Sequence, residues 1–234
     1  MAEGQSKRYE IKFVPDGVDL QELEFLVKSH PLGFSKIYHT RKINNIYFDT
    51  PDLSAYLDNV EGETSRKKVR VRWYGEQSNI LQDPILEIKH KSGVLGWKKR
   101  YRIEPKSFDL KTNFKLRDVV RPISENAATP ADLDRVDLDA WQPMLINSYT
   151  REYFLSFDGK FRLTIDRNMR YFDVNPLKEF SEGPFQKDRL IMEVKFATDY
   201  FASSNEVTKY FPFRISKNSK YVSGIEKLKK WSTN

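Results

Sequence analysis

The sequence predicts an α+β protein in which a mainly antiparallel, closed or nearly closed β-barrel is flanked by helices. About eight or nine segments alternate apolar and charged residues with period two, which is the pattern of β-strands. Short turns join most of these segments, as in antiparallel hairpins. Several of the strands are long, and long antiparallel strands are typical of barrels.

The composition fits a folded protein, and we expect a single domain over residues 1–234 because the strand pattern resumes after each interruption. The absence of cysteine excludes disulfides and thiolate sites, and it favours a cytoplasmic location. The N-terminus lacks the apolar core of a signal peptide, and no apolar run approaches the roughly 18 residues of a membrane span. A net charge of +7 predicts a polyanionic partner, which the charge alone does not identify.

The first predicted strand is 8–13, in which Arg8, Glu10 and Lys12 share one face. The elements expected after it are a helix capped by Asp19 that ends near His30, strands at 34–39 and 43–49, and a short helix at 53–57.

The strand at 65–75 separates its residues into two faces. Val69, Val71 and Trp73 form an apolar face. The other face is a row of cations, namely Lys68, Arg70 and Arg72. Such a row alone fits a solvated sheet face. The recurrence of such rows in strand after strand favours a functional role for the positive charge over a merely solvated face.

The next two strands, at 84–91 and 97–103, form a hairpin around 93–96. Their basic faces carry Lys89, Lys91, Lys98, Arg100 and Arg102, with Glu87 among them.

The rhythm of strands breaks between residues 106 and 142, where we expect one or two short helices at 108–120 and a loop at 124–130. The predicted elements after this break are a hairpin of 143–157 and 160–170 turning at 158–159, a strand at 190–196, and a helix after 212–220 that ends near Trp231.

If the barrel closes, helices must cover its apolar outer faces and the basic faces line its interior. Desolvating so many cations costs several kcal/mol each, so the interior must stay wet or hold a polyanion. A linear phosphate chain matches this demand, because arginine binds phosphate oxygens with two parallel hydrogen bonds. Glu10, Glu87 and Glu193 could neutralise some cations through salt bridges to strand neighbours, or hold a divalent metal that bridges phosphates.

No constellation for nucleophilic catalysis occurs in the sequence. His30, His39 and His90 are scattered and are expected as surface or packing residues, and there is no Walker loop. Phosphoryl transfer does not require a protein nucleophile, since positioning and charge stabilisation can carry it.

Nine short sequence motifs run through nearly the whole chain. They are Arg8-Tyr9, Ile46-Tyr-Phe-Asp49, Val69-Arg-Val-Arg-Trp-Tyr-Gly75, Leu86-Glu-Ile-Lys89, Trp97-Lys-Lys-Arg-Tyr101, Tyr149-Thr-Arg151, Phe161-Arg-Leu-Thr-Ile-Asp166, Met192-Glu-Val-Lys195 and Ser216-Lys-Asn-Ser-Lys220. In this order they resemble the catalytic domain of the vacuolar transporter chaperone (VTC) polyphosphate polymerases. That family is a branch of the CYTH-like triphosphate tunnel metalloenzymes.

The resemblance implies a tunnel barrel that binds ATP and polyphosphate or triphosphate, with Mn²⁺ or Mg²⁺ held by Glu193. It implies catalytic roles for Arg70, Arg72, Lys89 and Arg151. Together with the basic faces it implies phosphate binding by Arg8, Lys12, Lys68, Lys98, Arg100, Arg162, Lys195, Lys217, Ser219 and Lys220.

One departure from the superfamily's first-strand motif narrows the range of reactions that we expect. The hydrolases and cyclases of this superfamily begin with Glu-x-Glu-x-Lys, whereas this chain has Arg8-x-Glu10-x-Lys12. The loss of one metal-binding carboxylate favours the polymerase branch, which moves the ATP γ-phosphate onto a polyphosphate chain.

Three alternatives stay open: a tripolyphosphatase or nucleoside triphosphatase, a non-catalytic polyphosphate-binding module, and a protein that binds nucleic acid. The last is disfavoured and no nucleic-acid partner is expected. Single-strand binding sets aromatic residues among the cations, and although Tyr149 and Tyr153 share the face of Arg151, we expect none on the face of Arg70.

Overall fold

The computed structural model describes residues 7–76, 80–103, 107–109, 115–126, 138–174 and 184–232. Its strands are β1 (Arg8–Phe13), β2 (Ser35–Lys36), β3 (Arg41–Asp49), β4 (Ser65–Tyr74), β5 (Ile80–Gln82), β6 (Ile85–Ser92), β7 (Leu95–Arg102), β8 (Ser107–Asp109), β9 (Gln142–Leu155), β10 (Arg162–Phe172), β11 (Phe185–Gln186) and β12 (Ile191–Ala197).

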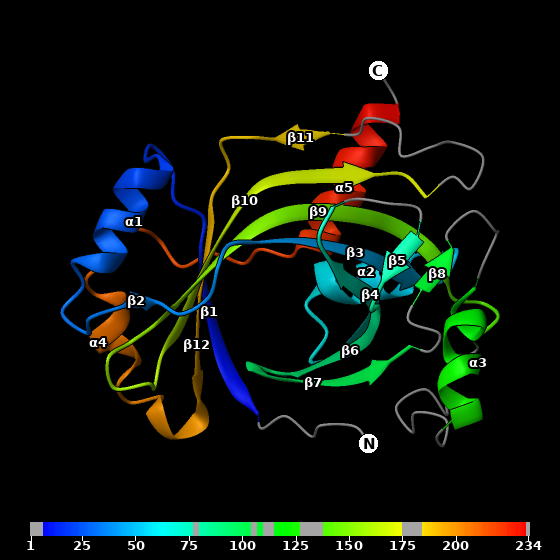
Figure 1. The fold of residues 1–234 in the computed structure, drawn as a ribbon, viewed down its shortest axis with the longest axis horizontal. Helices are drawn as coiled ribbons and strands as arrows, with labels where there is room; N and C mark the ends of the chain where they lie inside the picture. The colour runs from blue at the N-terminus through cyan, green and yellow to red at the C-terminus, as the bar shows by residue number, and fades with distance from the viewer. Residues whose placement is uncertain are drawn as a thin grey trace.

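Eight of these strands close into an antiparallel barrel (Figure 1). The order around the barrel is β10-β12-β1-β7-β6-β4-β3-β9, and β9 pairs with β10 to complete the ring. The closure confirms the predicted fold class. It also means that the two faces of each strand become an inside and an outside.

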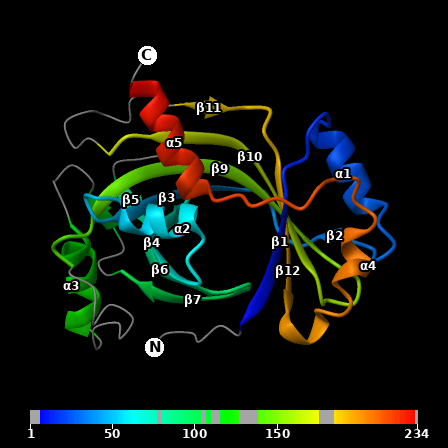
Figure 2. The same ribbon diagram turned by 180° about the vertical axis from the view of Figure 1, so that it is seen from behind.

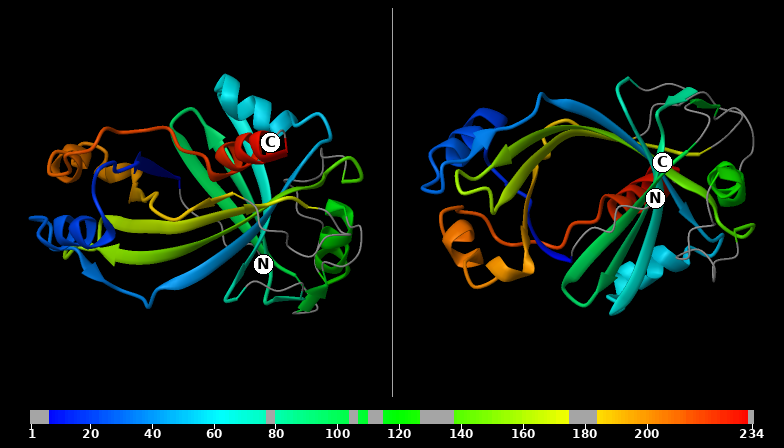
Figure 3. Two further views of the ribbon diagram at one scale, coloured as in Figure 1. Left: turned by 90° about the horizontal axis from the view of Figure 1, so that it is seen from above. Right: turned by 60° about the horizontal axis from the view of Figure 1, so that its bottom comes forward.

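Helices surround this barrel on different sides. They are α1 (Leu20–Lys28), α2 (Ser54–Glu61), α3 (Leu116–Asn126), α4 (Ser204–Thr208) and α5 (Lys220–Ser232). The views in Figures 1 and 3 place α1 and α4 on one side and α3 on the opposite side. Figure 2 shows α2 and α5 lying together on a further side.

The helices cover apolar strand faces, as a barrel with a polar interior requires. Leu116 and Val119 of α3 pack with Val71 and Leu86, which lie on the face opposite the cations of β4 and β6. A second cluster buries Leu23 and Val27 of α1 together with Val207 of α4 against β10 and β12. The remaining cluster packs Tyr221 and Ile225 of α5 with residues of β3, β9 and β10.

Asp49 fastens α2 and α5 to the barrel. Its fully buried carboxylate accepts hydrogen bonds from the backbone N–H groups of Ala55 and Tyr56 at 2.9 and 3.0 Å, and from the Tyr221 hydroxyl at 2.6 Å. Gly224 allows α5 to approach, since a Cβ there would lie 2.4 Å from Leu145 Cδ2. These contacts fix the first turn of α5, which carries Lys220.

Most predicted elements appear in the structure. The strand at 8–13 is confirmed as β1, Asp19 caps α1 with a full capping box, and the hairpin of β9 and β10 turns at 158–159 as expected. The predicted strand at 34–39 shrinks to Ser35–Lys36, an edge strand that pairs only with β9 in the described part of the chain.

Sequence reasoning failed mainly in the middle of the chain. The helix expected within 108–120 is α3, which starts at Leu116 and continues to Asn126, so residues 124–126 are helical and not loop. Its apolar positions bury against the barrel, and this tertiary contact outweighs the loop-forming composition that follows. Residues 110–114 and 127–130 lie outside the described part.

The small sheet of β5 and β8 and the helix α4 were not predicted, because strands of three residues and a helix of five are too short to show a period. None of the helices described combines the length and the apolar character needed to cross a membrane.

Candidate functional site

A cavity of about 310 Å³ occupies the interior of the barrel, and thirteen cationic side chains line it. Every barrel strand except β3 contributes at least one of them. They are Arg8, Lys12, Lys68, Arg70, Arg72, Lys89, Lys91, Lys98, Arg100, Arg151, Arg162, Lys195 and Lys220. Only the carboxylates of Glu10 and Glu193 join them among the described lining residues. The cavity therefore holds a large excess of positive charge.

The predicted site residues converge on this cavity with one exception. All of them line it except Lys217, which precedes α5 and whose charge acts on Lys91 from nearby. The convergence follows from strand alternation, because residues two apart point to the same side of a barrel wall. Their roles in binding and catalysis remain predictions.

Glu87 is the centre of one charge cluster. Its carboxylate is 1% exposed and lies 2.6 Å from Arg70 Nη2 and 3.0 Å from Lys98 Nζ. Arg100 Nε is 2.9 Å away, and Arg72 Nη1 is 3.7 Å away. Burial would raise the pKa of Glu87, but the cations led by Arg72 and Arg70 outweigh burial and hold this pKa well below its usual range.

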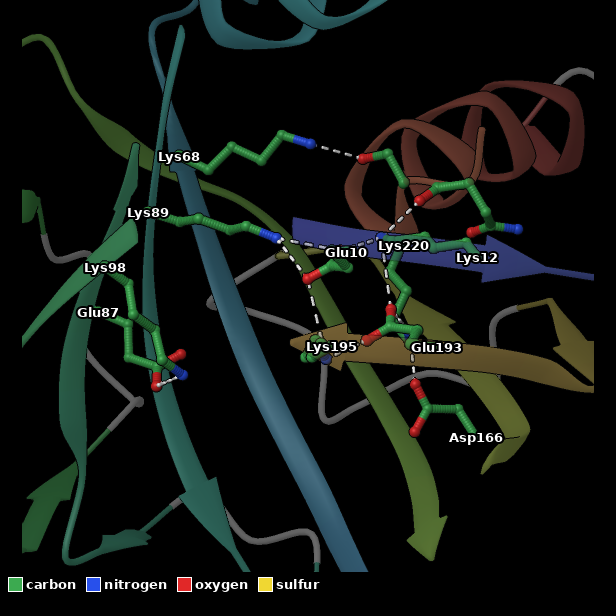
Figure 4. Close-up of polar contacts among 12 residues, drawn as sticks. Glu10, Lys12, Lys68, Glu87, Lys89, Lys98, Asp166, Glu193, Lys195 and Lys220 are labelled. Carbon is green, nitrogen blue, oxygen red and sulfur yellow. Dashed lines mark hydrogen bonds and ion pairs between the residues drawn. The ribbon is translucent and has the colours of Figure 1, made fainter. Parts of the chain in front are cut away.

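A second cluster surrounds Glu193 and Asp166 (Figure 4). Lys220 Nζ lies 2.6 Å from Asp166 and 3.4 Å from Glu193. Arg151 binds both oxygens of Asp166. Lys195 Nζ is 2.5 Å from Glu193. Burial opposes the charge of Glu193, yet Lys195 and Lys220 hold its pKa well below the usual range. The first turn of α5 is thus part of the cavity wall.

Two neighbouring rows cross the same three strands, β4, β6 and β7. The arginine row pairs Arg70 with Glu87 and Glu87 with Arg100 in direct register. The next inward-facing positions form the lysine row, in which Lys68 lies opposite Lys89 and Lys89 lies opposite Lys98. Like charges directly opposite each other on adjacent strands are destabilising.

The pKa values of the lysine row reflect this crowding. Burial and then Lys89 lower the pKa of Lys68 well below its ordinary value. Burial also lowers the pKa of Lys98 to about 6, with Arg72 and Arg70 adding to the effect although Glu87 opposes it. Glu10 supports the charge of Lys89, but burial and Lys12 outweigh it and bring that pKa to about 8.

Neutral side chains hold the arginines in place. Arg72 donates to Asn45 Oδ1 at 2.9 Å and to the Tyr149 hydroxyl at 3.1 Å, and Arg70 donates to the Tyr47 hydroxyl at 3.1 Å. Sequence reasoning missed Asn45 and Tyr47. Their positions two apart in β3, on the face that pairs with the arginines of β4, would have identified them.

The histidines behave as expected for residues outside the site. His30 is buried, and its Nε2 lies 3.0 Å from the carbonyl oxygen of Val207. Neither His39 nor His90 is among the residues that line the cavity. Ser219 does line it, but its hydroxyl accepts from Lys68 Nζ at 2.8 Å. The described wall therefore offers charge stabilisation and no base-activated nucleophile.

A divalent metal fits this wall only in one way. Among the described residues, no group of three or more His, Cys, Asp or Glu side chains is placed to hold a metal ion. Mg²⁺ in phosphate-binding enzymes commonly uses one or two carboxylates and completes its shell with water and phosphate oxygens. Glu193 lines the cavity and could supply such a carboxylate together with a bound phosphate.

Comparison with known proteins agrees with this architecture. A protein from Hippeastrum, described as a candidate adenylyl cyclase with a dominant triphosphatase activity, aligns with a TM-score of 0.52 and 14% identity over 95% of both chains. A candidate adenylate cyclase from Vibrio parahaemolyticus aligns with a TM-score of 0.52 and 14% identity, over 94% of this chain and 99% of that one. At such low identity these alignments show a shared fold alone.

No curated protein matches the sequence significantly. The model of one family, the VTC domain, matches residues 7–229 and confirms the resemblance seen in the motifs. Because this match spans nearly all of the sequence, the chain belongs to the VTC domain family.

Proposed function

We propose that the protein is a phosphotransferase that moves the γ-phosphate of ATP onto the end of a polyphosphate chain inside the barrel. The observation that supports it most is the convergence of thirteen cations on one cavity inside the barrel, with the carboxylates paired to them. A linear phosphate polymer carries negative charge along its whole length, so it can engage cations on opposite walls at once.

In the proposed reaction, an oxygen of the acceptor's terminal phosphate attacks the γ-phosphorus of ATP. The bond between this phosphorus and the β,γ-bridging oxygen breaks, and ADP leaves with the electron pair. Arg70, Arg72, Lys89 and Arg151 spread the negative charge that develops on the transferred group. The remaining cations of the wall hold the donor and acceptor chains in line.

The arginines are suited to this task because they are already oriented. Arg72 is fixed by Asn45 and Tyr149, and Arg151 by Asp166, so little reorganisation is needed when phosphate binds. Glu193 would hold Mn²⁺ or Mg²⁺, which would supply further neutralisation of phosphate charge when bound.

A hydrolase is the second candidate, with water in place of the phosphate acceptor. The dominant triphosphatase activity described for the Hippeastrum protein of similar fold favours it. The same wall would serve both reactions, because only the acceptor differs. A module that binds polyphosphate without chemistry is the third possibility.

Incubation of the protein with ATP and Mn²⁺ separates the three. Long polyphosphate on a urea gel, with one ADP released for each phosphate added to the chain, would support the polymerase. Orthophosphate without polymer would contradict it and favour the hydrolase. Tight polyphosphate binding without release of ADP would leave only the binding module. Arg72→Lys, which keeps the charge but not the guanidinium fork, should lower turnover about 100-fold, as loss of one oriented donor does elsewhere.

A further inference from the structure

Three tyrosines from separate segments gather around one arginine at an end of the cavity. The guanidinium carbon of Arg41 lies 5.0 Å from the ring centroid of Tyr38 and 5.6 Å from those of Tyr74 and Tyr153. Tyr38 and Tyr153 also meet edge to face, with ring centroids 5.7 Å apart. All three tyrosines line the same cavity as the cations.

This group, the tyrosine end, is open to solvent. Tyr38 is 51% exposed and Tyr74 is 39% exposed, although aromatic side chains of this size usually bury most of their surface. Arg41 lies over the rings and holds them in position. Because Tyr38 and Tyr74 still expose much of their surface, part of each side chain is available to a planar ligand.

The tyrosine end continues the line of the phosphate-binding residues. Along β4 the residues that face the cavity are Tyr74, Arg72, Arg70 and Lys68, in that order. The expectation that the face of Arg70 carries no aromatic residue was therefore wrong, because Tyr74 lies on it. Two residues of a strand span about 7 Å, so Tyr74 follows Arg72 by roughly the length of a small chemical group. On β9, Tyr153 follows Arg151 in the same way.

We propose that the tyrosine end binds the base of a nucleoside triphosphate, which stacks on the rings of Tyr38 and Tyr74. The proposal rests on the proposed function, since it assigns the base of the donor to this end of the same cavity. A nucleotide carries its base at one end of a linear triphosphate. With the base at the tyrosines, the phosphates run past Arg72 and Arg70 toward the lysine row.

Stacking explains why both aromatic rings and a guanidinium occur here. Every nucleobase has a π-face, and proteins bind it with aromatic side chains and with planar arginine. The opposite end of the cavity is lined by Lys12, Lys68 and Lys91 with Ser219, a set suited to phosphate. The two ends therefore give the donor a single favoured direction.

The test compares ATP with inorganic tripolyphosphate, which has the phosphates but no base. Dissociation constants of both would be measured by calorimetry for the wild type, Tyr38→Ala, Tyr74→Ala and the double variant. Tyr210→Ala is the matched control, because Tyr210 is 47% exposed and does not line the cavity. Tyr74→Phe tests the ring itself, since it keeps the stacking face and removes only the hydroxyl.

We expect the double variant to bind ATP about 10-fold more weakly, as loss of base stacking does elsewhere, and to bind tripolyphosphate with an affinity changed less than about twofold. Tyr74→Phe should lose less affinity for ATP than Tyr74→Ala, and Tyr210→Ala should match the wild type. Equal losses for both ligands, or no loss for ATP, would overturn the base site while the tunnel function stands. A wild type that binds neither ligand would overturn the proposed function and the base site with it.

Discussion

The arginine row and the lysine row lie side by side on the same strands, yet they are built for different tasks. In the arginine row a buried carboxylate, Glu87, lies between Arg70 and Arg100 in register. In the lysine row no carboxylate lies in register between the lysines, and the pKa values of Lys68, Lys89 and Lys98 lie below the ordinary value for lysine. The first row carries an acid within the wall, whereas the second keeps a larger excess of positive charge that a ligand can neutralise.

The same contrast shows how a wall of cations can fold without ligand. Glu87 binds Arg70, Lys98 and Arg100, so the most crowded part of the wall is held by one acid. Breaking a buried ion pair is costly, while relief of like charges is favourable. Substitutions in the arginine row should therefore mainly change stability, and substitutions in the lysine row should mainly change phosphate binding.

The largest effect is expected from Glu87→Gln. The variant leaves several buried cations without their carboxylate and should lose about 3–5 kcal/mol of unfolding free energy. Urea unfolding measures this loss, and tripolyphosphate should stabilise the variant more than the wild type. Glu206→Gln removes an exposed salt bridge to Lys209 and should leave stability nearly unchanged. A loss below about 1 kcal/mol for Glu87→Gln would contradict the view that the buried carboxylate of the arginine row stabilises the fold.

In the lysine row, Lys89→Met should act on binding and not on folding. Hydrogen bonds to charged groups contribute about 1.5–3 kcal/mol, so tripolyphosphate affinity should fall about 10- to 100-fold. Stability should stay close to wild type, because Glu10 keeps Lys12 and Lys195 as partners. Calorimetry and thermal unfolding measure the two quantities. A destabilised variant with unchanged affinity would reverse the assignment.

The pH dependence separates binding from stability, because the lowered pKa of Lys98 predicts opposite trends for the two. Between about pH 6 and 10 the unfolded chain holds a proton on Lys98 that the folded chain has released, so stability should rise with pH by up to about 1.4 kcal/mol per unit. Bound phosphate favours the charged amine, so tripolyphosphate affinity should fall over the same range.

Both pH trends should weaken in Lys98→Met, which separates them from the titration of the ligand itself. Calorimetry in buffers with different ionisation enthalpies reports the proton taken up on binding. An affinity that rises with pH in the wild type would contradict the role given to the lysine row.

The smallest effect is expected from Lys217→Met. Lys217 was predicted to bind phosphate, but it does not line the cavity and acts on Lys91 only through its charge. Exposed charges contribute about 0.2–1 kcal/mol, so tripolyphosphate affinity should fall no more than a few-fold. That loss should vanish at high salt, because added ions screen the interaction. A loss as large as that of Lys89→Met would restore Lys217 to the binding site.

The sequence predicted the strands of the barrel well because their alternation is regular and their turns are explicit. It could also place Arg70 and Arg72 on one face, since period two is a local property. It could not show that Glu87 joins four cations, because that depends on the register of β4, β6 and β7. The tyrosine end was likewise hidden, since Tyr38, Arg41, Tyr74 and Tyr153 meet only when β3 pairs with both β4 and β9.

The proposed function requires that linear phosphate binds inside the barrel, which a crystal structure with tripolyphosphate would show. We expect three phosphates within the cavity, with Arg72, Lys89 and Arg151 in contact with their oxygens. Tripolyphosphate bound only on the outer surface, with the cavity wall unchanged, would contradict it.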